Sequence, residues 1–489
     1  MSLDDYIWAW IVLAVTIMGW LIPFVMLFVV PVGRKPSSAT AWLMLLFAVP
    51  WFGLLVFLLI GFPKLSPRRR ALQRTSDDSI LAFVEQVRND PALQPLVNPP
   101  LSPRYEPLVN LSTAVGALPA MGANRVRLIT DYDAILAQLA ADIEAAQIFV
   151  HVQFYILIAD QATEVCFRAM ERALARGVPV RVLYDPIGSR KYPTYRATLE
   201  RMQRTGIQAY PMLPLWRWRD PNRPDLRNHR KIVVVDGEVA YTGSLNLIER
   251  GYHRKDAIVY DELMARVEGP AADALDAVFR TDWFSETGER LDGTDPVHPI
   301  VLTPAGSTLC QVLPSGSAFE NENNLKLFVA LFYAARQRIV ICNPYFVPDD
   351  SLLMAVISAA TRGVKVTMYN SAAQDQFLVA NAQRSYYDEL LAAGVEIRLY
   401  HEPMLLHTKT ISIDDDIAVI GSSNLDMRSF QLNLEVSLVC YDPAVVADLR
   451  RAEEEYYDHS QPLDRVTWRQ RPKAARLAEN VSRLMAALL

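Results

Sequence analysis

The sequence has few of the residues that stabilise extracellular or metal-dependent proteins. Its 489 residues include only four cysteines, and these are scattered without a CxxC or zinc-ligand spacing. We therefore expect neither a disulfide framework nor a zinc site, and reduced thiols suit a reducing compartment. Basic residues are not in surplus either. The formal net charge of −5 argues against a nucleic-acid partner held by bulk charge.

Charged residues are also missing from two long stretches near the N-terminus, Tyr6–Val32 and 36–63. Each is longer than the roughly 20 apolar residues that cross a bilayer. A cleaved signal peptide fits poorly, because Asp4 and Asp5 precede the first stretch and no small-residue cleavage site follows it. The sequence therefore predicts two transmembrane helices within residues 1–63. Pro50 leaves a kinked helix or a re-entrant hairpin as alternatives for the second stretch.

Basic residues near the ends of these stretches predict the orientation, because the more basic flank stays in the cytoplasm. Two lie between the stretches and five follow the second: Arg34 and Lys35, then Lys64, Arg68, Arg69, Arg70 and Arg74. With two spans, both termini and everything after residue 63 are expected in the cytoplasm.

The sequence pattern of the rest of the chain predicts a linker followed by a duplicated α/β fold. Residues 64–122 are rich in Pro, Arg and Ser, which is typical of a juxtamembrane linker. Strand and helix patterns then alternate, and the second half repeats the first: the segment Gly177–Tyr184 resembles Gly363–Tyr369, and Gly206–Tyr210 resembles Gly394–Tyr400. We expect two similar α/β lobes that form one pseudo-symmetric catalytic unit, residues 123–290 and 291–460, and a C-terminal tail, 461–489.

Each half ends in the same constellation, HxKx4D followed at the same distance by GSxN. The first copy is His229, Lys231, Asp236, Ser244 and Asn246, and the second is His407, Lys409, Asp414, Ser422 and Asn424. Residues two apart on a strand point to one face, so His and Lys enter the site together. A hairpin then returns Ser and Asn towards the His. Two copies at matching points of a repeat make chance a poor explanation.

These residue types suit phosphodiester transfer without a metal. A neutral imidazole can attack phosphorus and form a phosphohistidine, while a protonated second imidazole gives a proton to the leaving alkoxide. Lysine charge and Ser or Asn donors can stabilise the non-bridging oxygens. No acidic cluster with metal-ligand character accompanies the motifs, so neither a metal nor another cofactor is expected.

Each catalytic histidine also needs a carboxylate on its other ring nitrogen. In the second half, Glu435 lies 28 residues after His407. In the first half, Asp256 has the matching spacing and Glu262 the matching sequence context. We favour Glu262, and we expect each half to supply the acid for its own histidine.

At these motifs the chain resembles the bacterial cardiolipin synthases of the phospholipase D superfamily. The resemblance rests on the segments Arg227–Asp236, Asn343–Pro348 and Gly421–Ser429 and on the two apolar stretches. It implies condensation of two phosphatidylglycerols to cardiolipin with release of glycerol at the bacterial inner membrane, with His229 as nucleophile and His407 as acid and base. One departure is visible, because Tyr260-Asp-Glu262 stands where the family usually has an aromatic residue, any residue and Asp.

The motifs leave rival functions open. A membrane phospholipase D would pass the same phosphatidyl group to water, and a superfamily nuclease or phosphodiesterase would use the same residues. The apolar stretches and the acidic balance count against a nuclease. Donor and acceptor lipids, acyl preference and oligomeric state are not encoded in these motifs.

Overall fold

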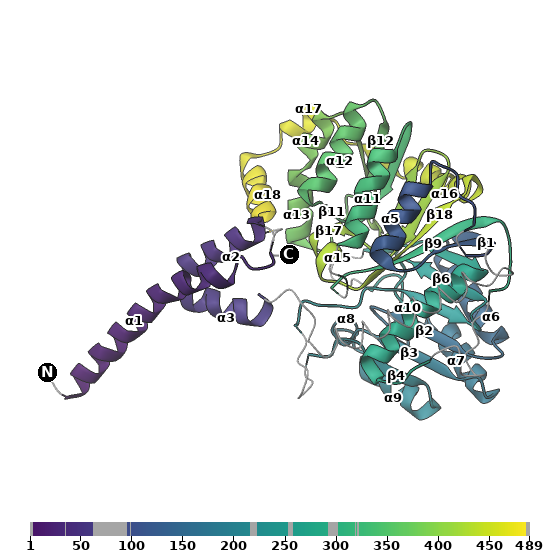
Figure 1. Ribbon diagram of the computed structural model, residues 1–489, viewed down its shortest axis with the longest axis horizontal. Helices are drawn as coiled ribbons and strands as arrows, with labels where there is room; N and C mark the ends of the chain where they lie inside the picture. The colour runs from purple at the N-terminus through teal and green to yellow at the C-terminus, as the bar shows by residue number, and fades with distance from the viewer. Residues whose placement is uncertain are drawn as a thin grey trace.

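The chain folds into two α/β lobes with a helical extension at the N-terminus (Figure 1). This computed structural model describes residues 3–34, 36–61, 95–97, 99–215, 223–252, 258–291, 302–317, 319 and 322–485. The two predicted lobes are present, and they are joined edge to edge.

Among the described residues, fifteen strands form one continuous sheet in the order β19-β13-β12-β10-β15-β16-β18-β9-β1-β8-β6-β5-β2-β3-β4. The first lobe contributes β1 (Ala120–Ile129), β2 (Val150–Phe154), β3 (Val180–Tyr184), β4 (Gln208–Pro211), β5 (Ile232–Val235), β6 (Val239–Gly243) and β8 (Met264–Glu268). The second contributes β9 (Thr308–Ser315), β10 (Arg338–Cys342), β12 (Lys365–Ser371), β13 (Glu396–Tyr400), β15 (Thr410–Ile413), β16 (Ile417–Gly421), β18 (Glu435–Tyr441) and β19 (Ser460–Pro462).

Reading outward from the centre, the strand order of one lobe mirrors that of the other. The central seam is the antiparallel pair β1 and β9, in which Ala120 faces Gln311 and Met121 faces Cys310. Apolar side chains from both lobes form one core cluster beneath this seam, including Val267 and Leu438. The internal repeat is therefore a pseudo-two-fold relation between two halves of a single sheet.

The motif strands lie inside this sheet because of their composition. β5 reads Ile-Val-Val-Val and is buried throughout, as β-branched side chains covered on both faces require. Helices cover the faces: α6 (Tyr132–Ala145), α7 (Glu164–Ala175), α8 (Pro186–Ser189), α9 (Tyr195–Thr205) and α10 (Pro270–Thr287) in the first lobe, and α11 (Asn323–Ala334), α12 (Asp350–Thr361), α13 (Phe377–Ser385), α14 (Tyr387–Ala392), α15 (Met427–Gln431) and α16 (Pro443–Asp458) in the second.

Both ends of the catalytic part pack against the second lobe. Helix α5 (Glu106–Gly116) and the start of β1 fall within the range expected to be a linker, and Leu108 and Val109 of α5 join the core of the second lobe. In the predicted tail, α17 (Arg465–Arg469) is followed by α18 (Lys473–Met485), which lies against α13 (Figure 1).

The N-terminal extension differs from the expected two spans. Helix α1 (Leu3–Val29) includes an apolar segment of 24 residues, Tyr6–Val29, and is the one helix in the described part of the chain long and apolar enough to cross a membrane. The second apolar stretch is broken into α2 (Pro36–Ala48) and α3 (Pro50–Ile60). The break falls at Val49 because Pro50 has no N–H to donate and restricts the residue before it to extended conformations.

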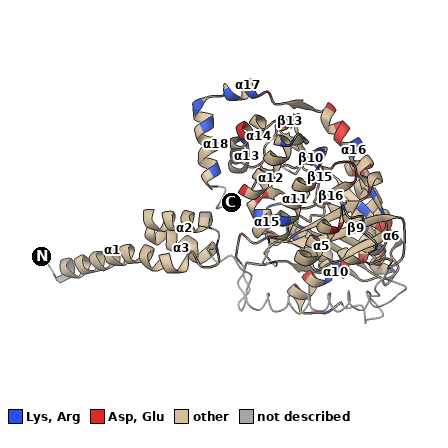
Figure 2. Cartoon of the chain, turned by 45° about the horizontal axis from the view of Figure 1, so that its top comes forward, with Lys and Arg blue, Asp and Glu red and all other residues tan. Residues whose placement is uncertain are grey.

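Helices α2 and α3 form an antiparallel hairpin. The rings of Trp42 and Phe57 pack edge to face with centroids 5.3 Å apart, and a Cβ on Gly53 would lie 3.0 Å from the Cα of Leu46. Neither helix contains a charged residue (Figure 2). At 1.5 Å per residue each helix is only about 17–20 Å long, which is shorter than the roughly 30 Å hydrocarbon layer.

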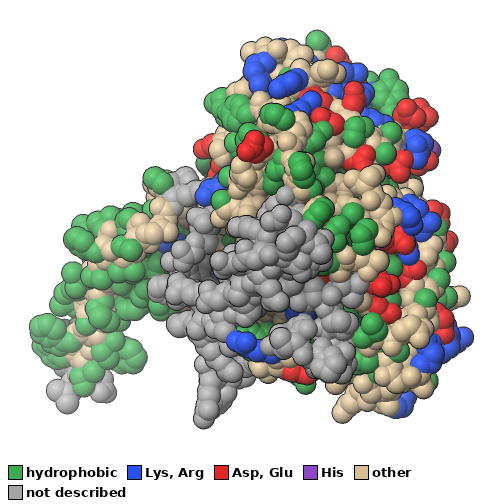
Figure 3. All heavy atoms as spheres, turned by 45° about the vertical axis from the view of Figure 1, so that its right-hand side comes forward, with side chains coloured by type: hydrophobic (Ala, Val, Ile, Leu, Met, Phe, Trp, Pro, Cys, Tyr) green, Lys and Arg blue, Asp and Glu red, His purple; other side chains and the backbone are tan. Residues whose placement is uncertain are grey.

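The tip of this hairpin reaches only part of the way along α1. A Cβ on Gly19 would lie 3.3 Å from Nε1 of Trp51, at the start of α3. Large apolar side chains cover the outside of the extension (Figure 3), among them Trp20 and Phe28 of α1, which are 70% and 82% exposed. The hairpin therefore has the geometry of a re-entrant element beside a single crossing helix.

This geometry makes a topological prediction that differs from the two-span prediction. Val32, 75% exposed between α1 and α2, should lie on the same side of the membrane as the lobes, and Tyr6 on the other side. The four native cysteines are buried, so single substitutions Val32→Cys, Tyr6→Cys and Asp415→Cys can be labelled with an impermeant maleimide in oriented vesicles. Val32→Cys should react from the same side as Asp415→Cys, in the second lobe. Reaction from the opposite side would restore the second span.

Candidate active site

The two motif histidines lie where the lobes meet. His229 precedes β5, and its backbone N–H donates to the carbonyl of Leu434 in the other lobe at 2.8 Å. His407 follows β14 (Met404–Leu406), and its N–H donates to the carbonyl of Asp261 at 2.8 Å. Strand β14 itself pairs in parallel with β7 (Val259–Asp261) of the first lobe. The backbone thus clamps each histidine against the opposite half.

The acids that orient the histidines are exchanged between the lobes. Nδ1 of His229 lies 3.0 Å from Oε2 of Glu435, and Nδ1 of His407 lies 2.8 Å from Oε1 of Glu262. The expected acids are present, but the expected pairing within each half is wrong. Because Glu435 opens β18 and Glu262 precedes β8 near the central seam, each carboxylate faces across it. Asp256, the other candidate in the first half, lies outside the described residues.

A carboxylate on Nδ1 fixes the tautomer of each imidazole and leaves Nε2 for chemistry. Burial lowers the pKa of His229 to about 4, although Glu435 opposes this shift and Lys231 adds to it. Burial also lowers the pKa of His407, against the effect of Glu262. Both imidazoles are therefore neutral at pH 7 when no substrate is bound.

The motif lysines are buried beside the histidines. Nζ of Lys231 donates to the carbonyl of His229 at 2.7 Å, and Nζ of Lys409 donates to that of His407 at 2.6 Å. Burial lowers the pKa of Lys231 to about 7, with Lys409 adding to the shift, and lowers that of Lys409 to about 8. The carboxylates of Glu435 and Glu262 partly offset both shifts. An anion bound between the lysines would restore full ammonium charge.

The serines of the GSxN segments bond to the acids or to the backbone beside them. Oγ of Ser422 donates to Glu435 at 2.5 Å and accepts from the N–H of Val436. Ser429, which the motif analysis did not single out, donates to the other oxygen of Glu435 at 2.9 Å. Oγ of Ser244 accepts from the N–H of Leu263, next to Glu262, and its hydrogen bond to that acid helps to lower the pKa of Glu262.

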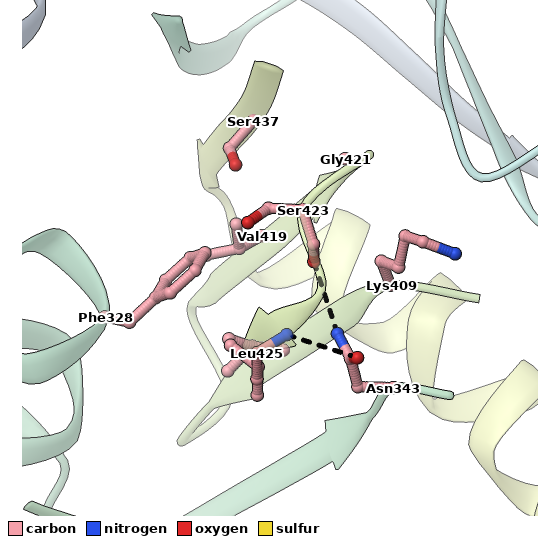
Figure 4. A pocket seen from close by; sticks show the side chains of 9 residues that line it. Phe328, Asn343, Lys409, Val419, Gly421, Ser423, Leu425 and Ser437 are labelled. Carbon is pink, nitrogen blue, oxygen red and sulfur yellow. Dashed lines mark hydrogen bonds between the residues drawn. The ribbon is translucent and has the colours of Figure 1, made fainter. Parts of the chain in front are cut away.

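The asparagines are placed differently. The side-chain oxygens of Asn246 and Asn424 are buried without a hydrogen-bond partner among the described residues. A small cavity next to Asn424 is lined by Lys409, Ser423 and Leu425 (Figure 4). There the amide of Asn343 donates to the carbonyl of Ser423 and accepts from the N–H of Leu425, both at 3.3 Å. Asn343 therefore fixes the backbone on either side of Asn424.

The motif aspartates, which the sequence grouped with the catalytic residues, are not in this cluster. Asp236 and Asp414 lie in the hairpin turns after β5 and β15, roughly 16 Å along the strand from the lysines. The carboxylate of Asp236 accepts from the N–H groups of Gln147, Ile148 and Phe149, at 2.7–2.9 Å. Asp414 binds the N–H groups of Arg336, Gln337 and Arg338 in the same way. Both aspartates hold the start of the neighbouring strand and contact no reacting group.

Two tyrosines that motif analysis missed flank the histidines. The ring of Tyr155 packs edge-on against His229 with centroids 5.1 Å apart, and that of Tyr260 packs against His407 at 5.2 Å. Tyr155 follows β2, and the match of Gln153-Phe-Tyr155 in the first half to Asn343-Pro-Tyr345 in the second half of the repeat was the available signal. In the described part of the chain no group of three or more His, Cys, Asp or Glu side chains is placed to hold a metal ion.

The crossed His–Glu pairs predict that turnover depends on both glutamates, each acting on the histidine of the other half. Glu435→Gln and Glu262→Gln should each lower turnover by at least about 100-fold, because the imidazole loses its tautomer and its stabilised cation. Asp236→Asn should instead lower the melting temperature and leave the rate per folded molecule close to wild type. Calorimetry together with active-site-normalised rates separates these effects. A rate loss for Asp236→Asn equal to that of Glu435→Gln would contradict the assignment.

The lysine pKa values predict an alkaline limit. As pH rises, His407 loses the proton that the leaving alcohol needs, and above about pH 7 Lys231 and then Lys409 lose the charge that attracts a phosphate. The value of kcat/KM should therefore fall with the macroscopic pKa values of these groups. A bound phosphate stabilises the two ammonium groups, so kcat should begin to fall at a higher pH than kcat/KM. On the acid side activity should persist to about pH 5, because the pKa of His229 is about 4. Constant kcat/KM up to pH 10 would refute this account.

Comparison with known proteins agrees with this geometry. The family described as "Cardiolipin synthase, PLD-like domain" matches residues 139–283 and 328–456. The cardiolipin synthase of Geobacillus thermodenitrificans is 33% identical over 93% of this chain and 90% of its own length. Cardiolipin synthase A of Serratia proteamaculans is 33% identical over 97% and 99%. A solved phosphatidylserine synthase of Haemophilus influenzae shares the fold, with a TM-score of 0.58, 15% identity and coverage of 79% of this chain and 99% of that one. The chain therefore belongs to the cardiolipin synthase family of phospholipase D-like proteins.

Proposed function

We propose that this chain makes cardiolipin by moving the phosphatidyl group of one phosphatidylglycerol to a hydroxyl of another, with release of glycerol. The observation that carries the proposal is the pair of crossed His–Glu contacts with two lysines beside them, in a chain that starts with an apolar helix long enough to cross a bilayer. Similarity over nearly the full length to cardiolipin synthases favours this transfer over hydrolysis.

In the first step, Nε2 of His229 attacks phosphorus while the bond from phosphorus to the glycerol oxygen breaks. His407 gives a proton to that oxygen, and glycerol leaves. In the second step, His407 takes the proton of the incoming phosphatidylglycerol hydroxyl, whose oxygen displaces His229 from phosphorus. Each histidine returns to its starting state, and Glu435 and Glu262 stabilise the imidazolium forms in turn.

His407 is proposed to take up its proton from solvent when the substrate binds. Burial lowers the pKa of His407, so this imidazole is neutral before the substrate binds. A phosphodiester anion beside it raises that pKa. Lys231 and Lys409 hold the non-bridging oxygens, since each ammonium has three donors and spends one on a histidine carbonyl. The amides of Asn246 and Asn424 are proposed to complete this phosphate site.

The lobes are proposed to lie at the cytoplasmic face of the bacterial inner membrane. Helix α1 crosses once, and the α2–α3 hairpin enters and leaves on the side of Arg34 and Lys35. The basic residues after the hairpin then lie on that same side, as the preference of basic residues for the cytoplasm requires.

Trapping distinguishes the two histidine roles. With a phosphatidyl donor that carries an activated aryl leaving group, His407→Asn should form a covalent lipid adduct, because this leaving group needs no acid. The adduct should persist, because nothing activates the incoming alcohol. His229→Asn should form none. Mass spectrometry of acid-quenched intact protein reads the result, and an adduct on His229→Asn alone would reverse the roles.

A further inference from the structure

A carboxylate that the reaction described so far does not use lies beside the second histidine. Asp375, in the loop between β12 and α13 of the second lobe, accepts from the hydroxyl of Tyr345 with both oxygens, at 2.6 and 2.5 Å. It also accepts from the hydroxyl of Tyr260 at 3.2 Å, and the ring of Tyr260 packs against His407. Residues from both lobes thus form one polar cluster next to the acid–base group.

The carboxylate of Asp375 can accept further hydrogen bonds. An ionised carboxylate offers about four acceptor positions, and the two tyrosine hydroxyls, with one O–H each, fill two of them. Asp375 is half-buried and has no ion pair within 4 Å among the described residues. Tyrosine hydroxyls are its hydrogen-bond donors, and Lys191 and Lys409 interact with it electrostatically without direct contact. An additional hydroxyl from a ligand would fit the same chemistry.

Among the described residues, a carboxylate at the position of Asp375 occurs in one half of the repeat only. Strands β3 and β12 are related by 186 residues, as Val180 and Val366 are through their pairing with β2 and β10. The same offset places Ser189 opposite Asp375, and Ser189 is buried, accepting from the N–H of Leu157 and donating to the carbonyl of Tyr155. On the side of His229 the carboxylate after β3 is Asp185, which is ion-paired with Arg227. Among the described residues, a carboxylate bonded by tyrosine hydroxyls and without an ion pair therefore lies only on the side of His407, where an alcohol leaves and enters.

An apolar surface begins next to this cluster. Helix α13 starts two residues after Asp375 with Phe377 and Leu378, which are 72% and 39% exposed. Helix α18, packed on α13, exposes Leu477, Val481 and Leu484. The helix itself lies on the side of the molecule that carries the N-terminal helices (Figure 1). A headgroup bound at Asp375 could thus keep its acyl chains in the bilayer.

We propose that Asp375, oriented by Tyr345 and Tyr260, binds the unreacting hydroxyls of the glycerol headgroup while its primary hydroxyl faces His407. This inference rests on the proposed function. One subsite serves both steps, since glycerol leaves from the position that the glycerol group of the second phosphatidylglycerol later occupies. Asp375 is then a specificity-determining residue, which selects a polyol over a simple alcohol.

An internal competition measures this selection. The full-length protein in mixed micelles receives the activated aryl donor together with equal concentrations of glycerol and 1-propanol, which has the same primary hydroxyl and no other. Mass spectrometry gives the ratio of phosphatidylglycerol to phosphatidylpropanol. The wild type should favour glycerol. Asp375→Asn should reduce that ratio by about 10- to 100-fold, because the hydroxyls lose a charged acceptor. Tyr345→Phe should reduce it by a smaller factor.

The ratio is internal to each sample, so a general loss of rate through His407 leaves it unchanged. Asp415→Asn removes one negative charge at an exposed turn of the same lobe and is the matched control, which should keep the wild-type ratio. A wild-type ratio in both Asp375→Asn and Tyr345→Phe would overturn the inference, as would a wild type without preference. Cardiolipin formation by the wild type from phosphatidylglycerol alone tests the proposed function separately.

Discussion

Each histidine depends on a glutamate from the opposite lobe, and much of the architecture maintains these two contacts. Glu435 must remain 3.0 Å from His229, and Glu262 2.8 Å from His407. The seam between β1 and β9 fixes the lobes in the required register. The backbone bonds from His229 to Leu434 and from His407 to Asp261 lock the same contacts locally. Neither lobe contains a complete site by itself, which explains why the duplicated halves share one sheet instead of lying as separate domains.

The site buries two carboxylates and two lysines close together. Glu435 and Glu262 keep pKa values below the ordinary range despite burial, because histidine, lysine and serine partners stabilise their ionised forms. Lys231 and Lys409 have no carboxylate in direct contact among the described residues, and burial brings their pKa values down to about 7 and 8. In the proposed reaction, the substrate phosphodiester adds a negative charge beside the two lysines. The same interaction then strengthens the ammonium charge as the transition state develops.

The membrane helices and the site have compatible directions. The α2–α3 hairpin returns the chain to the side from which it entered, and Trp51 at its tip meets Gly19 partway along α1. Helices α13 and α18, which carry exposed apolar residues, lie on the side of the catalytic fold nearest to this extension (Figure 1).

The sequence by itself determined the duplicated α/β architecture, the motif residues and the apolar character of the N-terminus, because repeats and motifs are local patterns. It could not pair the acids with the histidines, since a spacing of 28 residues from His407 to Glu435 is the same whether the carboxylate faces its own lobe or the other. It placed Asp236 with the chemistry, although strand length carries that side chain to the far end of β5. The apolar stretch around Pro50 has the same composition whether it kinks or folds back as two short antiparallel helices, and the packing of Trp42 on Phe57 shows that it folds back. The contacts of Tyr260 and Asp375 arise between segments more than 100 residues apart, so only the tertiary structure decided what surrounds each histidine.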